Sequence, residues 1–369
     1  MSHRISYVLL ATLTVAACNS TDTLGPRTPD DSGIPPSAPP PPPVNYSEAH
    51  PLTDLVREDG VADMYLGFEG GLYFDNNDVP SAHAEFGSST ASQIQPLDTS
   101  GAPDPDGAIV LMSISMSNAA REWCRSGTGG TSGAQGCAPH TFMDQAATDP
   151  AIGDNLVIVN GARPQASLSL WDSPDDEDYT RVATEVLPDF GLTEAQVQIV
   201  WVKTALKKKY TRPSLPDAGA DAYVLEATIG DVVRALRVRY PNLKQVFFTS
   251  RIYAGYARPP QNSPEPWAYE TGFGTKWAIE AQITQRATGA VDRESGDLAG
   301  MPFMAWGPYV WSYGDRPRED GLMWTQDLYA ADCMHPNEDG ARIVADYLLD
   351  FFKTSPFTRC WFLDGVSCS

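Results

Sequence analysis

Short apolar runs alternate with longer amphipathic stretches over most of this chain. The runs that favour buried strands are 108–113, 156–160, 197–202, 246–249 and, with a weaker pattern, 302–306. The stretches that favour helices are 179–187, 225–239, 275–285 and 338–352. Apolar strands separated by amphipathic helices indicate a parallel sheet that is covered on both faces. The predicted fold class is therefore α/β, a three-layer α/β/α sandwich with a mostly parallel central sheet.

The beginning of the chain has the pattern of an export signal. Arg4 supplies a positive charge, and the apolar run 7–17 is too short to span a bilayer as a helix. The sequence Val15-Ala16-Ala17-Cys18 matches the cleavage box of a bacterial lipoprotein. We expect residues 1–17 to be a signal peptide and Cys18 to carry the lipid that anchors an exported protein to the cell envelope. The alternative is a plain secretory signal with an incidental cysteine.

Two further segments precede the main domain. Residues 18–50 are rich in Pro, Ser, Thr and Asp, and such a segment is expected to be a disordered tether that holds the domain away from the membrane. Residues 51–105 combine glycines with aromatic residues, which predicts a loop-rich or β-rich extension packed on the main domain. The main domain is then 106–369.

Charge restricts the class of partner. Acidic residues number 47 and basic residues 26, for a formal net charge of −21. Because phosphate binding needs positive charge, a nucleic-acid partner is not expected. A polyanionic substrate is repelled at long range, whereas a neutral or acylated substrate is not. The acidic run 175–178 is expected to lie on the solvated surface.

The cysteines that follow the tether agree with export. Cys124 and Cys137 bracket one loop, and Cys360 and Cys368 bracket a short tail, so both pairs suit local disulfides in an oxidising compartment. Cys333 is expected to be a packed thiol, with a Cys-His nucleophile as the alternative. No cysteine spacing is typical of a zinc site and the histidines are scattered, so no metal is expected.

Three residues form a candidate catalytic set. Asp332 and His335 stand three residues apart, directly before the helix expected at 338–352, so the carboxylate can hold the imidazole in one tautomer. Ser117 follows the strand expected at 108–113, at a strand-to-helix turn that exposes its hydroxyl. This set predicts a nucleophilic serine activated by a histidine.

The order of these residues resembles that of the SGNH, or GDSL-type, hydrolases. Asp332 and His335 fall on the Asp-x-x-His of the family's last block, and Ser115-Met116-Ser117-Asn118 stands where Gly-Asp-Ser would. A Gly-x-Ser-Asn variant is similar to the first block of carbohydrate esterases. The resemblance covers about 107–352 and implies an SGNH-like hydrolase domain of flavodoxin-like α/β/α architecture that needs no cofactor.

The resemblance also implies an oxyanion hole. The N–H groups of Ser117 and Gly161 are the expected donors, since Gly161 follows the strand 156–160 as the glycine of the second block does. The third block, Gly-x-Asn-Asp, is absent. Asn118 or Lys203 is the candidate for a third donor.

Residues after other strands are candidates for substrate binding. Arg251 and Tyr253 follow the strand 246–249, and Trp306 ends the run 302–306. Ligands of open parallel sheets bind beyond the carboxyl ends of the strands, and aromatic side chains suit sugar rings or aryl esters. Ordinary core and loop packing is the alternative.

We therefore expect an exported, lipid-anchored serine esterase that hydrolyses carboxylic esters, with O-acetyl groups on carbohydrates as the first candidate substrate. The alternative function is a catalytically inactive SGNH-fold lipoprotein that binds glycans. A structural envelope protein is a third option.

Overall fold

The computed structural model describes residues 49–56, 63–125, 136–207, 212–257 and 264–368. The expected signal peptide, Cys18 and the tether up to residue 48 lie outside the described residues. Within the described ranges, no helix is long and apolar enough to cross a membrane.

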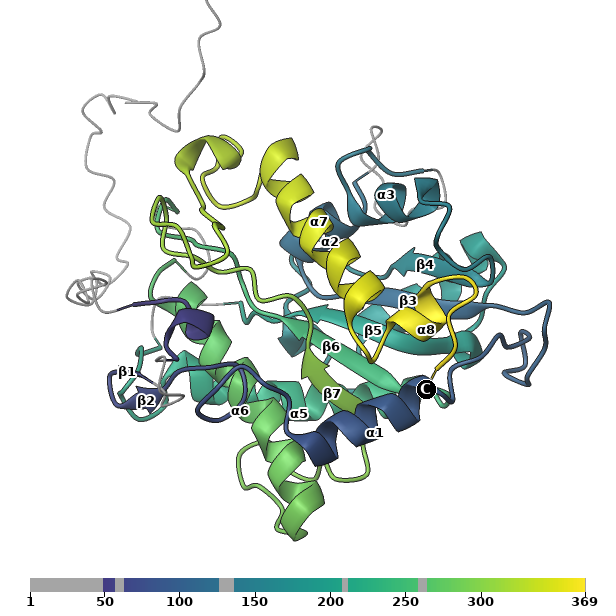
Figure 1. Cartoon of the computed structure of the whole chain (residues 1–369), viewed down its shortest axis with the longest axis horizontal. Helices are drawn as coiled ribbons and strands as arrows, with labels where there is room; N and C mark the ends of the chain where they lie inside the picture. Colours follow the sequence, from purple (N-terminus) through teal and green to yellow (C-terminus); the bar gives the residue numbers. More distant parts are fainter. Residues whose placement is uncertain (1–48, 57–62, 126–135, 208–211, 258–263, 369) are drawn as a thin grey trace, which may run out of the picture.

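A five-stranded sheet forms the centre of the molecule (Figure 1). Its strands are β3 (Ile109–Ile114), β4 (Leu156–Asn160), β5 (Val197–Lys203), β6 (Gln245–Thr249) and β7 (Phe303–Trp306). All neighbouring strands are parallel, in the order β4-β3-β5-β6-β7. Numbered within the sheet this is 2-1-3-4-5, the flavodoxin-like order. Each expected strand is present with ends within one residue of the prediction.

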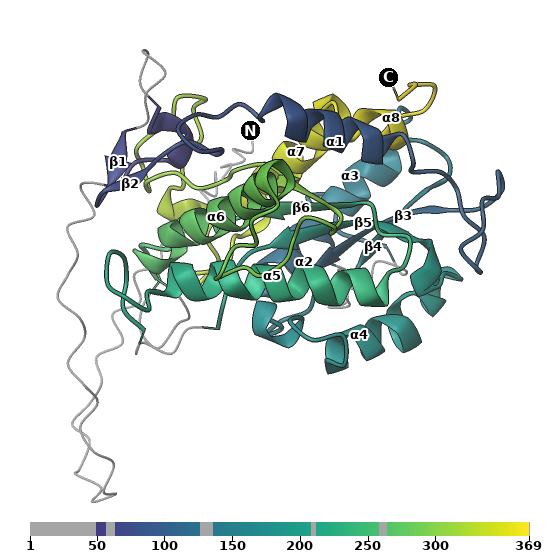
Figure 2. The same ribbon diagram turned by 90° about the horizontal axis from the view of Figure 1, so that it is seen from below.

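Helices cover both faces of this sheet (Figures 1 and 2). One face carries α4 (Glu177–Arg181), α5 (Asp221–Arg239) and α6 (Trp267–Thr288), and the other carries α1 (Ser81–Ala91), α2 (Ser117–Trp123), α3 (Phe142–Thr148), α7 (Glu338–Thr354) and α8 (Arg359–Phe362). Alternate residues of each strand point to opposite faces. Thus Val110 and Met112 pack with α5 and α6, while Leu111 packs with α2 and α7. The predicted three-layer α/β/α sandwich is confirmed.

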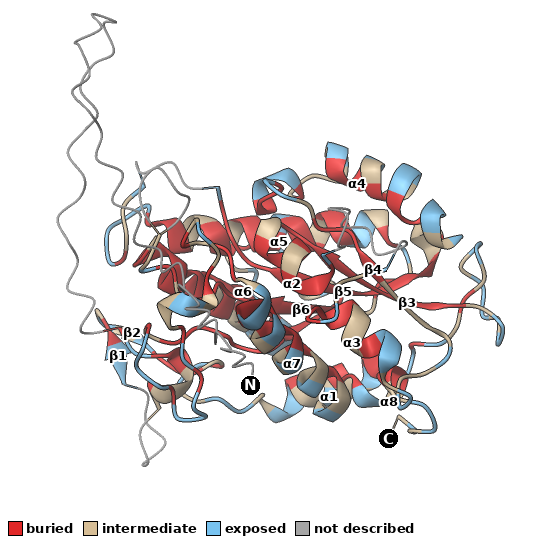
Figure 3. Ribbon diagram, turned by 90° about the horizontal axis from the view of Figure 1, so that it is seen from above, coloured by how far each residue is buried: buried red, intermediate tan, exposed pale blue. Residues whose placement is uncertain are grey.

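Most of the sheet is coloured as buried in Figure 3, which explains why its strands are nearly continuous apolar runs in the sequence. Every residue of β3, β5, β6 and β7 is buried, and only β4, at the sheet edge, is partly exposed. A strand covered on both faces has no solvated side that would select polar residues. The inner strands therefore show no polar alternation.

The helices depart more from expectation than the strands do. Both α5 and α6 begin earlier than predicted, and α4 continues into a π-helical segment, Val182–Val186. Helices α1, α3 and α8 were not predicted. Short 3-10 helices lie at Leu52–Asp54, Leu168–Leu170, Pro188–Phe190, Glu194–Gln196 and Gln326–Leu328.

We expected the segment 51–105 to be a loop-rich or β-rich extension packed on the main domain. It contains the two-stranded hairpin of β1 (Met64–Tyr65) and β2 (Phe68–Glu69), but also α1. The His83 side chain on α1 bonds through Nε2 to the Met304 carbonyl oxygen of β7 at 2.8 Å. Helix α1 is therefore part of a sheet-covering layer.

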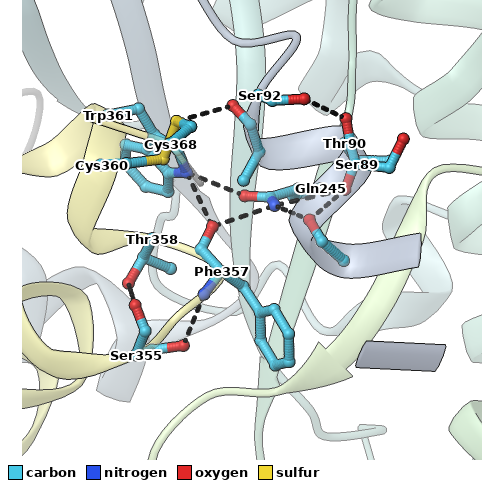
Figure 4. Close-up of a disulfide and its surroundings, with 12 residues drawn as sticks. Ser89, Thr90, Ser92, Gln245, Ser355, Phe357, Thr358, Cys360, Trp361 and Cys368 are labelled. Carbon is cyan, nitrogen blue, oxygen red and sulfur yellow. Dashed lines mark hydrogen bonds between the residues drawn. A yellow bond between two sulfur atoms is a disulfide. The ribbon is translucent and has the colours of Figure 1, made fainter. Parts of the chain in front are cut away.

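Both expected disulfides are present, Cys124–Cys137 and Cys360–Cys368, and Cys333 is buried as a thiol. The second disulfide lies beside the side chain of Gln245, at the start of β6 (Figure 4). Gln245 donates a hydrogen bond to the Phe357 carbonyl oxygen at 3.0 Å and accepts one from Trp361 Nε1 at 3.1 Å. The carboxyl-terminal segment is thereby fixed to the end of the sheet opposite the loops described next.

Candidate active site

The candidate residues gather at the carboxyl ends of the strands. Ser117 is the first residue of α2, three positions after β3 ends at Ile114, and His335 lies in the loop before α7. The strand order reverses at β3, because β4 and β5 lie on opposite sides of it. Crevices at such a reversal are the usual ligand sites of open parallel sheets.

Ser117, His335 and Asp332 form one hydrogen-bonded chain. The Ser117 Oγ and His335 Nε2 atoms are 2.7 Å apart, and His335 Nδ1 and Asp332 Oδ2 are 2.6 Å apart. With its proton on Nδ1, the imidazole donates to the carboxylate and accepts from the serine hydroxyl. Residues 218 positions apart in the chain thus meet in the geometry of a nucleophile, a base and a group that orients the base.

The loop before α7 explains how Asp332 and His335, three residues apart, can form a hydrogen bond through their side chains. The second carboxylate oxygen of Asp332 accepts hydrogen bonds from the backbone N–H groups of Met334 at 3.1 Å and His335 at 3.0 Å. Asn337 then caps α7, because its Oδ1 accepts from the Gly340 N–H at 3.0 Å. One oxygen of Asp332 therefore shapes the loop while the other holds the imidazole.

The environment sets the protonation state of both groups. Burial lowers the pKa of His335 below its ordinary value, although the hydrogen bond to Asp332 acts in the opposite direction. Burial alone raises the pKa of Asp332, but hydrogen bonds from His335 and Met334 outweigh it, and the net shift is downward. Near neutral pH the pair is a neutral imidazole beside a carboxylate, which is the form a general base requires.

The turn that presents Ser117 contains a strained residue. Ser115 is buried and has a φ of 106°, in the region that favours glycine. It stands where the resembled family has a glycine. The Ser115 carbonyl oxygen accepts a hydrogen bond from the Arg163 N–H at 3.1 Å, which joins this turn to the loop after β4.

Replacing Ser115 with glycine is expected to raise the free energy of unfolding by about 1 kcal/mol. Relief of a backbone strain of roughly 1–3 kcal/mol is partly offset by the greater entropy of glycine in the unfolded chain. Urea unfolding measures the change. Ser115→Ala is the control, because it removes the hydroxyl and retains the strain. A Ser115→Gly protein no more stable than Ser115→Ala would contradict the interpretation.

Two of the expected oxyanion donors, Ser117 and Asn118, are the first two residues of α2 and line the cavity at the site. The Ser117 N–H belongs to the first turn of α2, where backbone donors have no acceptor within the helix. Asn118 is 1% exposed, and its Nδ2 has no hydrogen-bond partner among the described residues. Gly161 follows β4 as expected, and a Cβ placed there would lie 2.7 Å from the Ser113 carbonyl oxygen, so this close approach requires glycine.

The structure does not bring Lys203 to the site. Its side chain is completely buried, and its ammonium group forms an ion pair with the equally buried Glu122 on α2. Burial raises the pKa of Glu122 and lowers that of Lys203. Sequence reasoning missed this pair because its members stand 81 positions apart. The ion pair joins the end of β5 to α2, so the role that we assign to Lys203 is to hold α2 in place.

Replacing Lys203 with methionine is expected to lower the free energy of unfolding by about 3–5 kcal/mol, since it leaves a buried carboxylate without its cation. Urea unfolding tests this. The matched control is the double variant Glu122→Gln with Lys203→Met, which removes both charges and is expected to recover much of the loss. Equal destabilisation of the single and double variants would show that the ion pair is not the cause.

Further residues that sequence reasoning missed hold the loops of the site. The Asn160 Oδ1 at the end of β4 accepts from Ser113 Oγ at 2.7 Å, and its Nδ2 donates to the Ala120 carbonyl oxygen of α2 at 2.9 Å. The signal in the sequence was that Asn160, a polar residue, ends an apolar strand.

Asp178 contradicts the expectation that the acidic run 175–178 is solvated surface. Its side chain is 1% exposed and accepts from Arg163 Nε at 2.6 Å and from Arg181 Nε at 3.2 Å. Arg181 also donates to the Gly161 carbonyl oxygen. The physical reason for the burial is that two guanidinium groups compensate the charge, and the result fixes the loop after β4.

A cavity of about 220 Å³ opens at Ser117 and His335. Its lining residues are Met116, Ser117, Asn118, Arg121, Pro164, Gln165, Ser167, Leu206, Lys207, Arg251, Met334 and His335.

Of the three residues expected to bind substrate, Arg251 is in this lining. Tyr253 packs against Tyr256 and Trp311, and Trp306 donates through Nε1 to the Leu72 carbonyl oxygen at 2.8 Å. Within the described ranges, no group of His, Cys, Asp or Glu is placed to hold a metal ion.

No family model and no curated protein matches the chain. Solved structures that it is similar to include Axe2, an acetylxylan esterase from Geobacillus stearothermophilus, at 14% identity over 68% of this chain and 96% of that chain, with a TM-score of 0.36. An extracellular lipase from Streptomyces rimosus has 13% identity over 66% of this chain and 100% of that chain, with a TM-score of 0.33. A carbohydrate esterase family 2 enzyme from Myceliophthora fergusii has 12% identity over 67% and 65%, with a TM-score of 0.32.

Proposed function

We propose that this protein is a serine hydrolase that cleaves carboxylic esters through an acyl-enzyme, and that it acts at the cell envelope, anchored by a lipid on Cys18. The observation that carries the catalytic part is the hydrogen-bonded chain from Ser117 Oγ through His335 to Asp332. The anchor rests on the cleavage box before Cys18 alone.

The proposed reaction has two steps. Ser117 Oγ attacks the ester carbonyl carbon while His335 Nε2 takes the hydroxyl proton, and the tetrahedral intermediate collapses as His335 returns that proton to the leaving alcohol. Water then attacks the acyl carbon while His335 takes one of its protons, and His335 returns that proton to Ser117 Oγ as the bond between Oγ and the acyl group breaks and the carboxylic acid leaves. Asp332 keeps the imidazole oriented and stabilises its charged form. The Ser117 N–H and the Asn118 side chain are the proposed donors to the oxyanion, because both residues line the cavity whereas Gly161 is not among its lining residues.

The size of the cavity favours a short acyl group. At about 220 Å³ it is smaller than the roughly 300–1,000 Å³ typical of sites for drug-sized ligands. An acetyl group presented on a carbohydrate hydroxyl meets this limit, because the cavity then needs to hold only the acetyl group and the adjoining part of the sugar. We therefore propose O-acetylated carbohydrates as the substrate class.

Covalent labelling tests the proposal directly. A fluorophosphonate is expected to form an adduct on Ser117, located by peptide mass spectrometry, and to abolish hydrolysis of 4-nitrophenyl acetate in proportion to labelling. Heat-denatured protein is the control for non-specific reaction. An absence of both the adduct and turnover would favour the inactive glycan-binding lipoprotein instead.

The pH dependence of kcat/KM follows from the lowered pKa of His335. Activity requires the neutral imidazole, so the rate is expected to fall as the pH falls through that pKa, with a midpoint below the ordinary value of about 6.5. Hydrolysis of 4-nitrophenyl acetate between pH 4 and 8 measures the midpoint. A midpoint above the ordinary value would contradict the effect of burial on His335.

A further inference from the structure

The cavity beside Ser117 has the opposite charge to the rest of the protein. The chain carries a formal net charge of −21, yet three cationic side chains line this cavity, those of Arg121, Lys207 and Arg251. No carboxylate side chain is among the described residues of the lining. The three cations come from α2 and from the loops after β5 and β6, so the fold brings them together.

Arg251 is the most deeply placed of the three. It is 1% exposed, two positions after the end of β6, and its backbone N–H donates to Thr271 Oγ1 at 3.2 Å. Glu265 is the carboxylate that most favours its charge, and Glu265 also accepts from the N–H groups of Ala254 and Tyr269, each at 2.9 Å. A guanidinium stays protonated even when buried, so it presents a permanent charge to the cavity.

Arg121 presents its charge on the same side of α2 as the nucleophile. It stands four positions after Ser117, a spacing that places two helical side chains on one face. No carboxylate of the described residues forms an ion pair with Arg121. Its charge still acts on the site, because it lowers the pKa of His335 from a distance.

We propose that the ester substrate carries a carboxylate close to its acylated hydroxyl, as an O-acylated sugar acid does, and that Arg121 and Arg251 bind this carboxylate. The proposal rests on the esterase function proposed above. Guanidinium groups suit this task because they bind carboxylates with paired hydrogen bonds. Repulsion by the distant surface charges is screened over about 8 Å at physiological ionic strength, whereas contacts inside the cavity are not.

A pair of matched esters tests the proposal. We would measure kcat/KM of the full-length protein for 4-acetoxybenzoate and 4-acetoxybenzamide, which share size and acyl group and differ in charge. The assays run at pH 8, where His335 is neutral with or without Arg121. The wild-type protein is expected to prefer the benzoate, mainly through KM. The Arg121→Gln variant is expected to reduce the ratio of the two kcat/KM values by about tenfold, and Arg121→Lys by less.

The control is Arg342→Gln, which makes the same change of net charge at an exposed position of α7 outside the cavity lining and is expected to leave the ratio unchanged. Equal losses for both esters in Arg121→Gln would overturn the proposal, because a donor to the oxyanion acts on every ester alike. If Arg121→Gln does not fold, the wild type decides: benzoate must inhibit the hydrolysis of 4-acetoxybenzamide competitively, and benzamide must inhibit it less. Turnover without preference for the benzoate overturns this inference only, whereas no turnover of either ester overturns the esterase function with it.

Discussion

Replacing Ser117 with alanine is expected to lower kcat for 4-nitrophenyl acetate by about 10⁴- to 10⁶-fold. The variant removes the hydroxyl that lies 2.7 Å from His335 Nε2, so no acyl-enzyme can form and only direct attack by water remains. The small change in volume at the start of α2 is expected to leave the fold intact. Steady-state kinetics measure the loss, and pre-steady-state kinetics show whether the burst of nitrophenol disappears with it.

The control is Ser89→Ala, a serine-to-alanine change on the exposed side of α1, remote from the cavity. This variant is expected to have the rate of the wild type. Because it is purified in the same way as Ser117→Ala, it shows whether a contaminating esterase varies between preparations. Turnover by Ser117→Ala at the rate of Ser89→Ala would end the assignment of Ser117 as nucleophile. The alternative, a glycan-binding protein of this fold, would then be the better account.

The sheet could be predicted from the sequence because its signal is local. A strand buried on both faces must be apolar throughout, so β3 and β5 stand out from the segments around them. Helix α7 was equally clear, since one of its faces packs on the sheet through Val344 and Leu348 while the other is solvated. The meeting of Asp332 and His335 also depends on short-range geometry.

Helix α1 shows what local patterns leave out. Its sequence, Ser81–Ala91, contains Gly87 and several serines, which are weak helix formers. Packing stabilises it, because a Cβ placed at Gly87 would meet the rings of Phe303 and Phe357 within 3 Å. Glycine is needed for this close approach to β7, and that requirement exists only in the folded molecule.

The chemistry around Ser117 was hidden for the same reason. Lys203 stands at the end of a strand, where a donor to the oxyanion was expected. Only the structure reveals that its charge is neutralised by Glu122. The positive lining of the cavity is likewise invisible in a chain with a net charge of −21. Sequence spacing thus predicts which residues end a strand, but the direction of each side chain depends on partners far away in the chain.

Replacing Asp332 with asparagine is expected to lower kcat by about 10⁴-fold, with a much smaller effect on KM. The asparagine oxygen can still accept from the backbone N–H groups of Met334 and His335, so the loop is retained. The amide nitrogen, however, donates to His335 Nδ1 and forces the imidazole proton onto Nε2. In that tautomer Nε2 cannot accept the proton of Ser117.

Kinetics of Asp332→Asn beside Asp339→Asn measure this effect. Asp339 is exposed in the first turn of α7, so its variant makes the same change of charge close to the site without touching the hydrogen-bonded chain. The Asp332→Glu variant is expected to recover part of the activity, because a carboxylate again holds the proton on Nδ1. A loss of less than about tenfold in Asp332→Asn would mean that Asp332 does not set the tautomer of His335, and the base would then have to be oriented by another group.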